Sequence, residues 1–377
     1  MKLLHISDLH IGKRLCELSL LEDQAYILNQ IIEIAEQEKP DAALIAGDLY
    51  DKSTPPAEAV RLCDDFLCRL AEVCPVTAII SGNHDSAERV SFGGRLMNSR
   101  GVYISPVYNG SVSPITLSDA HGEADIFLLP FIKPVHVRAA FPDEEISSYT
   151  DALRVAVEHL PIDHSRRSIL VTHQYVTGAS RSESEEMSVG GSDNVDAAVF
   201  APFDYVALGH LHMPQNVGSD AVRYCGSPLK YSFSEAKGEK SVTIVDVEAK
   251  GTLALREIPL KPLRDMVQLR GDFAQLSDRV PGNPESDPFT RITLTDENDI
   301  PDAFNRLRLV YPNLLRLDYD NTRTRSGGVV EINEQAQSKS PDELLDELFV
   351  QQCGQPMSGQ QRDLAMKLIS EIWEGEK

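Results

Sequence analysis

The sequence lacks several features that would place the chain in common classes of protein. No apolar run approaches the roughly 20 residues that a membrane-spanning helix needs. The opening segment, MKLLHISDLH, has polar and charged residues where a signal peptide requires an apolar stretch. The 6 cysteines form no CxxC pair and are too sparse for a disulfide-stabilised scaffold. We therefore expect a cytoplasmic protein without membrane contact, whose cysteines are small buried hydrophobic residues.

Basic side chains are also scarce. The chain has 36 lysines and arginines against 58 aspartates and glutamates, and its formal net charge is −22. A surface of this charge repels nucleic acid, and typical DNA-binding domains are basic. Composition alone therefore favours an enzyme that acts on a small molecule. A polymeric phosphate substrate requires metal ions, local basic patches or a partner to supply the attraction.

The first part of the chain, residues 1–260, alternates short apolar runs with amphipathic stretches. This alternation is typical of a layered α/β domain. Apolar residues at helical spacing predict helices over 20–38 and 56–73, and the pattern over 241–258 predicts a β-hairpin. We expect the apolar runs between the helices to form buried strands.

Composition changes near residue 261. Residues 261–320 are predicted to form a small separate α+β unit, with strands at 266–269, 290–293 and 314–318 and a short helix at 301–309. The segment 321–339 is polar and rich in turn-forming residues, so it is predicted to be a linker.

The final segment, 340–377, contains two helix-start signals. SPDE (340–343) and SGQQ (358–361) are capping-box patterns, and each precedes an amphipathic stretch. Two short helices cannot bury their apolar faces against each other alone, so they need a docking surface. That surface is either the body of the chain or a partner, and the linker favours a partner. The residues predicted to contact it are Leu344, Leu345, Leu348, Phe349, Leu368, Ile369 and Trp373.

Polar side chains follow five of the predicted strands, at the point where each strand ends. The strands are the apolar runs at 3–6, 42–46, 76–80, 169–171 and 205–208. Because ligands of α/β sheets bind beyond the carboxyl ends of the strands, we expect these side chains to form one site. In chain order they are Asp8 and His10, then Asp48, then Asn83, His84 and Asp85, then His173, and finally His210 and His212.

The types of side chain indicate a metal site. Imidazole mixed with carboxylate and amide oxygen, without thiolate, argues against structural zinc and suits Mn²⁺ or Fe²⁺, with Mg²⁺ a further option. Seven candidate ligands are too many for one ion but suit two ions that are bridged by a carboxylate. The candidates are Asp8, His10, Asp48, Asn83, His173, His210 and His212.

The order DxH, GD, GNHD, H and GHxH resembles the calcineurin-like metallophosphoesterase superfamily over residues 1–258. Within it, MKLLHISDLHIGK, LIAGDLYDKSTPP, ISGNHDS and LGHLHMPQ are similar to the nuclease subunits of SbcCD-type exonucleases. The resemblance implies a four-layer αββα sandwich over 1–260 and a capping domain over 261–320. It also implies that 340–377 docks an SbcC-like coiled-coil ATPase. The implied substrate is DNA, cut as a 3′–5′ double-strand exonuclease and a single-strand or hairpin endonuclease, by a homodimer within a heterotetramer that serves DNA repair.

The resemblance also implies a role for each site residue. Asp8, His10 and His212 are assigned to one ion, Asn83, His173 and His210 to the other, and Asp48 to the bridge. His84 corresponds to a residue that contacts the phosphate and assists the leaving oxygen, and we expect Asp85 to orient its imidazole. The sequence departs from some family nucleases at Asp51, where those proteins have a second histidine.

Two other functions are compatible with the same pattern. A phosphomonoesterase or small-molecule phosphodiesterase would suit the acidic composition but not the additional unit and the tail. A scaffold without metals would be expected to lack some ligands, whereas every expected ligand is present. Protein Ser/Thr phosphatases are disfavoured because GD is followed by LYDK and the third motif is GNHD.

Overall fold

The computed structural model of the chain describes residues 1–180, 182, 193–322, 324, 345–350 and 357–374, without the side chains of residues 366 and 368–374. Contacts divide the chain into two compact units. The first comprises Met1–Thr295 and Ile300–Asp318, and the second comprises Asp296–Asp299 and Tyr319–Lys377. Within the described ranges, no helix combines the length and the apolar character needed to cross a bilayer.

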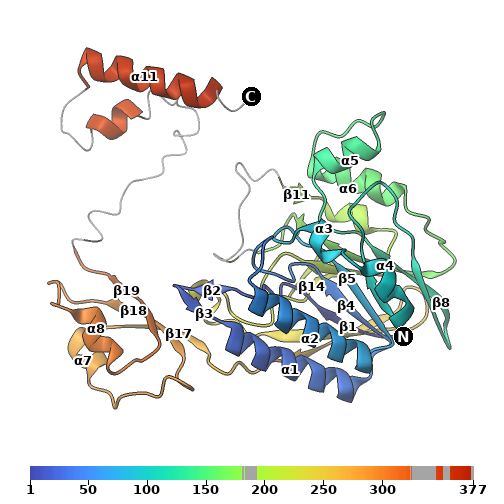
Figure 1. Ribbon diagram of the computed structural model, residues 1–377, viewed down its shortest axis with the longest axis horizontal. Helices are drawn as coiled ribbons and strands as arrows, with labels where there is room; N and C mark the ends of the chain where they lie inside the picture. The colour runs from blue at the N-terminus through green and yellow to red at the C-terminus, as the bar shows by residue number, and fades with distance from the viewer. Residues whose placement is uncertain (181, 183–192, 323, 325–344, 351–356, 375–377) are drawn as a thin grey trace. The chain divides into compact units, whose positions relative to one another are not determined.

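The first of two six-stranded sheets has four parallel strands, because helices return the chain between them (Figure 1). The predicted β-hairpin is present, and it extends the sheet antiparallel to β1. The order is β16-β15-β1-β4-β5-β6, formed by β1 (Lys2–Ile6), β4 (Ala42–Ala46), β5 (Val76–Ile80), β6 (Val102–Ile104), β15 (Ser241–Val247) and β16 (Leu253–Pro259).

The second sheet pairs β8, β9, β12 and β14 in parallel and has an antiparallel strand at each edge. Its order is β13-β14-β12-β9-β8-β7, formed by β7 (Ile115–Asp119), β8 (Gly122–Leu128), β9 (Arg167–His173), β12 (Tyr205–Gly209), β13 (Gln215–Val217) and β14 (Ser219–Tyr224). Two short pairs lie outside the sheets: β2 (Arg14–Leu15) with β3 (Leu18–Ser19), and β10 (Tyr175–Val176) with β11 (Asn194–Val195).

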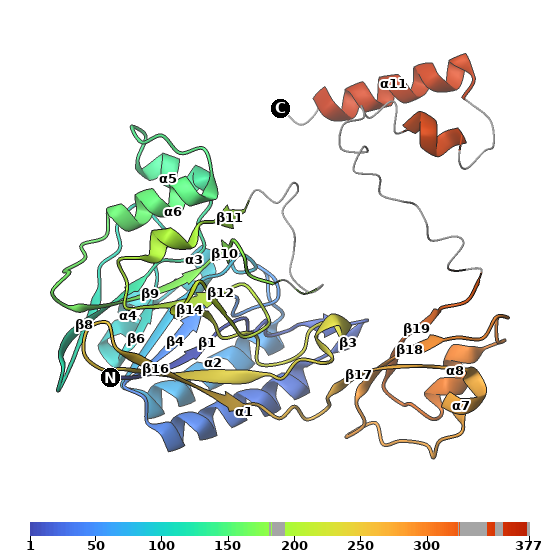
Figure 2. The ribbon, with the colours of Figure 1, turned by 180° about the vertical axis from the view of Figure 1, so that it is seen from behind.

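Three hydrophobic cores define the layers. Figures 1 and 2 show the helices that cover the sheets. One core lies between the two sheets and includes Leu44 from the first and Ala207 from the second. The helices α1 (Leu21–Glu38) and α2 (Ala57–Val73) cover the outer face of the first sheet. The helices α5 (Pro134–Ala140) and α6 (Tyr149–Glu158) cover that of the second. The predicted αββα sandwich is confirmed.

Several short helical elements lie between the strands along the chain. They are the helices α3 (Ala87–Val90) and α4 (Gly94–Met97) and the 3-10 turns η1 (Asn98–Arg100), η3 (Ala197–Phe200) and η4 (Phe233–Glu235).

A three-stranded sheet follows the sandwich, in the order β17-β18-β19. It consists of β17 (Met266–Gly271), β18 (Phe289–Leu294) and β19 (Leu314–Tyr319), with α7 (Phe273–Ser277) and α8 (Ala303–Arg308). These elements match the predicted α+β composition. Lys230 Nζ lies 2.7 Å from Asp265 Oδ1, so the start of this element is tied to the sandwich by an ion pair. The domain boundaries at 260, 320 and 339 stay predictions.

Among the described residues of the second unit, helical segments include 345–350 and α11 (Gly359–Glu374). Ser358 and Gln361 exchange hydrogen bonds at the start of α11, which confirms the predicted second capping box. Leu345, Leu348 and Phe349 lie in the first segment. Leu344 and the first capping box lie outside the described residues, as do the side chains of Leu368, Ile369 and Trp373.

The prediction for the cysteines is partly wrong. Cys63, Cys74 and Cys225 are buried, whereas Cys16 and Cys68 are exposed. Cys68 lies on the polar side of α2, five positions beyond Cys63, so the two thiols point in different directions from the helix axis. Cys353 lies outside the described residues.

Candidate metal centre

The structure brings together all seven residues that the sequence singled out as metal ligands. They lie at or directly beyond the carboxyl ends of β1, β4, β5, β9 and β12, as the strand pattern predicted. The parallel pairs β1–β4, β4–β5 and β9–β12 bring these ends to one edge of each sheet. The histidines and aspartates of this set are buried, with His210 the most exposed at 8%.

The backbone is strained at four of these residues. Asp8, His10, Asp48 and His210 have positive φ angles of 52°, 42°, 51° and 105°. Residues other than glycine rarely adopt such angles. Each such residue costs about 1–3 kcal/mol and persists only where its surroundings hold it. Here the His10 N–H donates to the Asp48 carbonyl oxygen at 2.9 Å, and the His210 N–H donates to Asp8 Oδ1 at 3.1 Å.

Two glycines allow the strand ends to approach each other. A Cβ on Gly82 would lie 2.1 Å from Asp48 Oδ1, and one on Gly209 would lie 1.9 Å from the Ala46 carbonyl oxygen. Any side chain at either position would therefore displace the carboxylate or the strand. The GNHD and GHLH motifs need their glycines for this reason.

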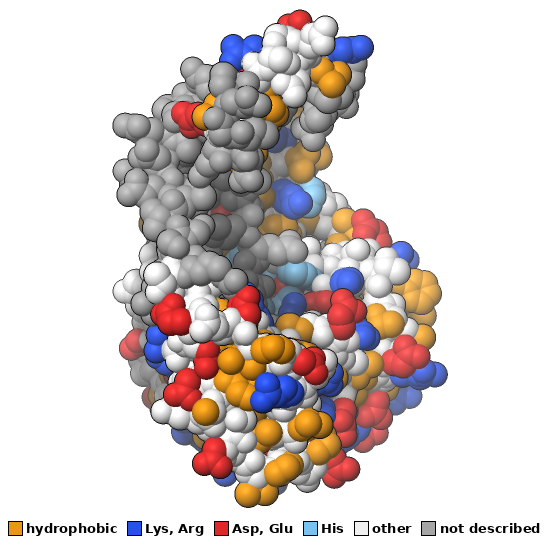
Figure 3. All heavy atoms as spheres, turned by 90° about the vertical axis from the view of Figure 1, so that its left-hand side faces the viewer, with side chains coloured by type: hydrophobic (Ala, Val, Ile, Leu, Met, Phe, Trp, Pro, Cys, Tyr) orange, Lys and Arg blue, Asp and Glu red, His pale blue; other side chains and the backbone are white. Residues whose placement is uncertain are grey.

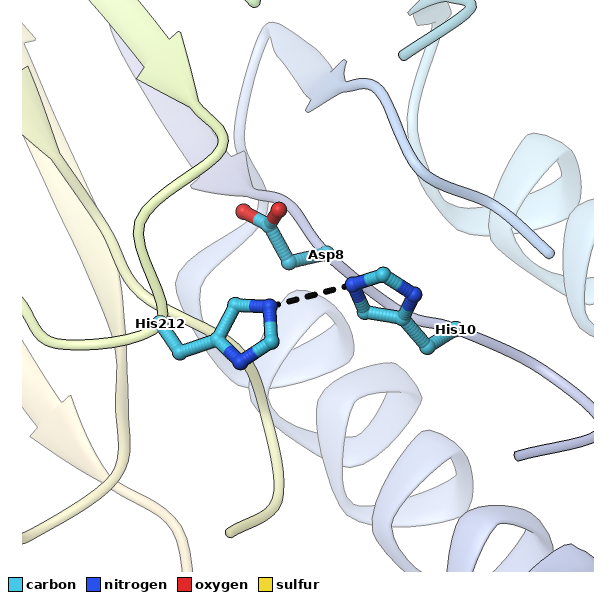
Figure 4. Close-up of side chains that lie close together, drawn as sticks. All are labelled: Asp8, His10 and His212. Carbon is cyan, nitrogen blue, oxygen red and sulfur yellow. Dashed lines mark hydrogen bonds between the residues drawn. The ribbon is translucent and has the colours of Figure 1, made fainter. Parts of the chain in front are cut away.

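A first cluster consists of Asp8, His10 and His212 (Figure 4). Their ligand atoms lie within 4.8 Å of one another, and His10 Nε2 is 3.1 Å from His212 Nε2. The side chains come from the two different sheets, since Asp8 and His10 follow β1 and His212 follows β12. The cluster therefore lies at the junction of the two sheets.

A second cluster surrounds Asp48. Its Oδ2 atom lies 3.3 Å from His173 Nε2 and 3.6 Å from His10 Nε2, so Asp48 reaches both clusters. Asn83 Oδ1 lies 2.9 Å from His173 Nε2 and 3.0 Å from His210 Nδ1. Carboxylate, amide oxygen and imidazole nitrogen thus converge on one small volume, and this mixed donor set fits divalent first-row transition-metal ions.

His84 lies at the edge of the centre and is half-buried. Its ring packs edge-on against His10, with 4.8 Å between the ring centroids. Its backbone N–H donates to Asp48 Oδ1 at 2.9 Å, while its ring nitrogen Nδ1 faces the Asp51 carbonyl oxygen at 3.1 Å. The ring also lies within ligand reach of the group formed by His10 and Asp48.

The hydrogen bonds of Asp85 differ from our expectation. Its carboxylate accepts the backbone N–H groups of Gly82, Leu49 and Tyr50, at 2.9, 3.1 and 3.0 Å. Asp85 therefore holds the loops after β4 and β5 together, and the group that faces the His84 ring is the Asp51 carbonyl. The GNHD motif gave no sign of this, because a carboxylate at a loop end can satisfy backbone donors as well as a neighbouring ring.

Burial and mutual charge shift the pKa values of the acids in opposite directions. Burial raises the pKa of Asp8 to about 6, although the imidazoles of His173 and His212 oppose the shift. For Asp48 burial acts in the same sense, but the adjacent His173 and His10 outweigh it and hold the pKa well below its usual range. The pKa of His173 rises to about 9, since the attraction of Asp48 exceeds the effect of burial. Carboxylates so arranged favour a nearby positive charge.

Sequence reasoning missed a buried ion pair behind His212. Lys240 Nζ lies 2.5 Å from Glu235 Oε2 and donates to the His212 carbonyl oxygen at 2.6 Å. Glu235 Oε1 lies 3.7 Å from His212 Nδ1, and both charged side chains are almost fully buried. Carboxylates often orient the histidines that bind metals in this way. Glu235 ends the 3-10 turn η4 and Lys240 directly precedes β15, so neither residue has the strand-end context that identified the others.

Comparisons with known proteins identify the family. The model for calcineurin-like phosphoesterases matches residues 1–214, and SbcD_C, a type 5 capsule protein repressor C-terminal domain, matches residues 262–352. The D subunit of the nuclease SbcCD from Staphylococcus epidermidis is 34% identical over 100% of both chains. The protein of the same name from Staphylococcus saprophyticus is 32% identical over 99% of both.

Two solved structures resemble the chain weakly. A dimetal phosphatase from Danio rerio covers 70% of this chain and 98% of its own, with 10% identity and a TM-score of 0.41. The protein TT1561 of Thermus thermophilus covers 68% of this chain and 98% of its own, with 14% identity and a TM-score of 0.39.

The layered fold and the convergent side chains define a metal-dependent phosphoesterase. The chain belongs to the calcineurin-like phosphoesterase family, in the group of the SbcCD D subunits that it matches from end to end. This fold implies a dimetal site, and the clusters around Asp8 and Asp48 are the candidate ligands for it.

Proposed function

We propose that the chain is a metal-dependent DNA nuclease, the D subunit of an SbcCD-type complex. The observation that carries the proposal is the pair of clusters that share Asp48, in a chain that matches SbcCD D subunits over its full length. The reaction is hydrolysis of phosphodiester bonds in duplex ends, single strands and hairpins. Work on chromosomal DNA with an ATPase implies a cytoplasmic protein.

The two clusters suit one ion each. Asp8, His10 and His212 would hold the first, and Asp48 would contact both. The second would be held by Asn83, His173 and His210. The mixture of oxygen and imidazole donors without thiolate favours Mn²⁺, with Fe²⁺ or Mg²⁺ as alternatives. When bound, such a pair supplies charge neutralisation of the phosphate and a more acidic water.

His84 is the residue proposed to serve the leaving oxygen. Because the Asp51 carbonyl oxygen can only accept, the Nδ1 that faces it at 3.1 Å must carry a hydrogen. Nε2 is then the nitrogen that can give a proton to a departing oxygen when the ring is charged. The half-buried position at the edge of the centre supports this role.

The regions beyond the sandwich are proposed to serve the complex. Residues 261–320 act as a capping domain that positions DNA, 321–339 as a linker, and 340–377 as the docking segment for an SbcC-like coiled-coil ATPase. The 52% exposure of Leu348 supports docking on a partner. Phe92, between α3 and α4, is 83% exposed, and Leu96, in α4, is 82% exposed. Exposed apolar side chains of this kind support a homodimer within a heterotetramer.

A nuclease assay tests the proposal. The full chain is incubated with linear duplex and hairpin DNA and Mn²⁺, with and without an SbcC-like ATPase and ATP. We expect single strands and hairpins to be cut by the chain alone and processive duplex digestion to need the ATPase. Hydrolysis of small phosphodiesters without any cleavage of DNA, in both conditions, would contradict the proposal.

A further inference from the structure

Lys13 is a basic side chain directly beside the candidate metal centre. Its Nζ atom lies 2.7 Å from Asp51 Oδ1 and 5.6 Å from the centre of the Tyr231 ring. That ring packs edge-on against His10, with 5.4 Å between centroids, and Asp51 Oδ1 lies 3.8 Å from His10 Nδ1. Figure 3 shows histidine side chains beside lysine or arginine side chains at the middle of one face, with acidic side chains around them.

The His10 ring separates Lys13 from the place where the ligand atoms converge. His10 Nε2 faces His212 Nε2 at 3.1 Å and Asp48 Oδ2 at 3.6 Å, whereas Nδ1 faces Asp51. The ammonium group of Lys13 therefore lies on the Nδ1 side. A phosphate bound at the Nε2 side is one imidazole ring away, so Lys13 is placed to contact a different phosphate of the same strand.

Asp51 holds Lys13 in place but does not use all the hydrogen-bond donors of its ammonium group. Its side chain is 16% exposed and that of Asp51 is 14% exposed, so solvent reaches the pair. An ammonium group has three N–H donors, and within the described residues Asp51 is the acceptor recorded for them. The remaining donors are free for phosphate oxygens, with which charged donors form strong hydrogen bonds.

We propose that Lys13 binds the phosphate next to the scissile one and so makes the site favour a polynucleotide over a small phosphodiester. The proposal rests on the proposed nuclease function. Asp51 is a positioning residue, because its carboxylate holds the ammonium group and its carbonyl faces His84. A local contact of this kind offsets the repulsion between DNA and a chain of net charge −22.

The test compares kcat/KM for a linear duplex with kcat/KM for bis(p-nitrophenyl) phosphate, using full-length Lys13→Gln in complex with the SbcC-like ATPase, with ATP and Mn²⁺. Loss of one charge-assisted hydrogen bond should lower the duplex-to-small-substrate ratio roughly tenfold. Loss of one phosphate contact should also make the slope of log(kcat/KM) for the duplex against log salt shallower by about 0.9. Lys13→Arg, which keeps the charge, should restore most of the ratio and the slope.

Lys250→Gln is the matched control. Lys250 forms an ion pair with Asp204 at 3.2 Å. It lies in the turn between β15 and β16, at the end of the strands opposite the metal centre. Its loss should change neither the duplex-to-small-substrate ratio nor the salt slope. Equal losses on both substrates in Lys13→Gln, or loss of bound metal by mass spectrometry, would show that Lys13 only supports His10. An unchanged ratio would also overturn the proposal. Failure of the wild-type complex to cut DNA of any kind would instead contradict the nuclease function itself.

Discussion

His10 Nε2 and His212 Nε2 lie 3.1 Å apart, although 202 positions separate the two residues in the chain. A direct contact between two neutral imidazoles needs a hydrogen on one of the nitrogens, whereas a shared cation needs a lone pair from both. Both rings are buried, and burial holds the pKa of His10 well below its usual value. The neutral ring that results is the form that binds a metal.

Metal should therefore stabilise the folded chain. Adding Mn²⁺ to chelator-treated protein should raise the thermal midpoint, because an ion that binds only the folded state at a hundredfold excess over Kd contributes about 2.7 kcal/mol. Differential scanning calorimetry at several Mn²⁺ concentrations measures the shift. In His10→Ala/His212→Ala most of the shift should disappear, and an equal shift in that variant would locate the binding elsewhere.

Asp48 is predicted to be the residue that both ions need. Asp48→Asn keeps the size of the side chain but removes the charge that faces His173 at 3.3 Å and His10 at 3.6 Å. We expect cleavage of phosphodiesters to fall below detection and bound metal, measured by mass spectrometry, to fall to one ion or fewer. Near-normal turnover with two ions bound would show that Asp48 is not the bridge.

His84→Gln should separate binding from chemistry. The variant is expected to keep both ions but to slow cleavage by roughly 10²–10⁴-fold, the usual contribution of a general acid or base. Metal analysis alongside single-turnover kinetics distinguishes the two effects. His84 lies within ligand reach of His10 and Asp48, so loss of an ion would instead assign it to the metal.

Local patterns predicted a layered α/β domain and the convergence of the candidate ligands, while the family resemblance implied the αββα sandwich. Apolar runs marked the strands, and strands that run parallel bring their polar ends together whatever the details of packing. The roles of Glu235 and Lys240 could not be predicted, because their pairing with His212 depends on how a loop folds back over β12. Asp85 was misjudged for a related reason, since sequence does not show which buried donors a carboxylate will find.

The buried pair of Glu235 and Lys240 yields a prediction about stability and pH. Glu235→Gln leaves the ammonium group of Lys240 buried without its partner, which should lower the free energy of unfolding by about 3–5 kcal/mol at neutral pH. In the folded chain the pKa of Glu235 is about 2, since His212 and Lys240 outweigh the opposing effect of burial. Its stabilising contribution is present above the usual glutamate pKa and is lost as the pH falls toward 2.

Urea denaturation of metal-free wild type and Glu235→Gln, at neutral and at acidic pH, measures this contribution. The difference between the two proteins should shrink as the pH falls, because protonated Glu235 resembles glutamine. Lys240→Met in the Glu235→Gln background should recover part of the loss by removing the unpaired charge. A difference that is independent of pH would mean that the Glu235 carboxylate is not charged in the folded chain.

The last prediction concerns the docking segment. Leu348 is 52% exposed in the helical segment 345–350, so Leu348→Glu should not disturb the folding of the chain itself. If the segment docks in a groove of an SbcC-like ATPase, a charge at this position would be desolvated without a partner, which costs several kcal/mol. We expect the variant to lose co-purification with the ATPase and ATP-stimulated duplex digestion, and to keep metal-dependent hydrolysis of a chromogenic phosphodiester.

Val135→Glu is the matched control, because Val135 is similarly exposed, at 56%, on α5 of the sandwich. Normal complex formation by Leu348→Glu, together with failure of a chain truncated before residue 340 to fold, would show that the tail packs on the body of the chain. The linker pattern at 321–339 would then have been misread, because a segment that completes the fold does not need freedom to reach a partner.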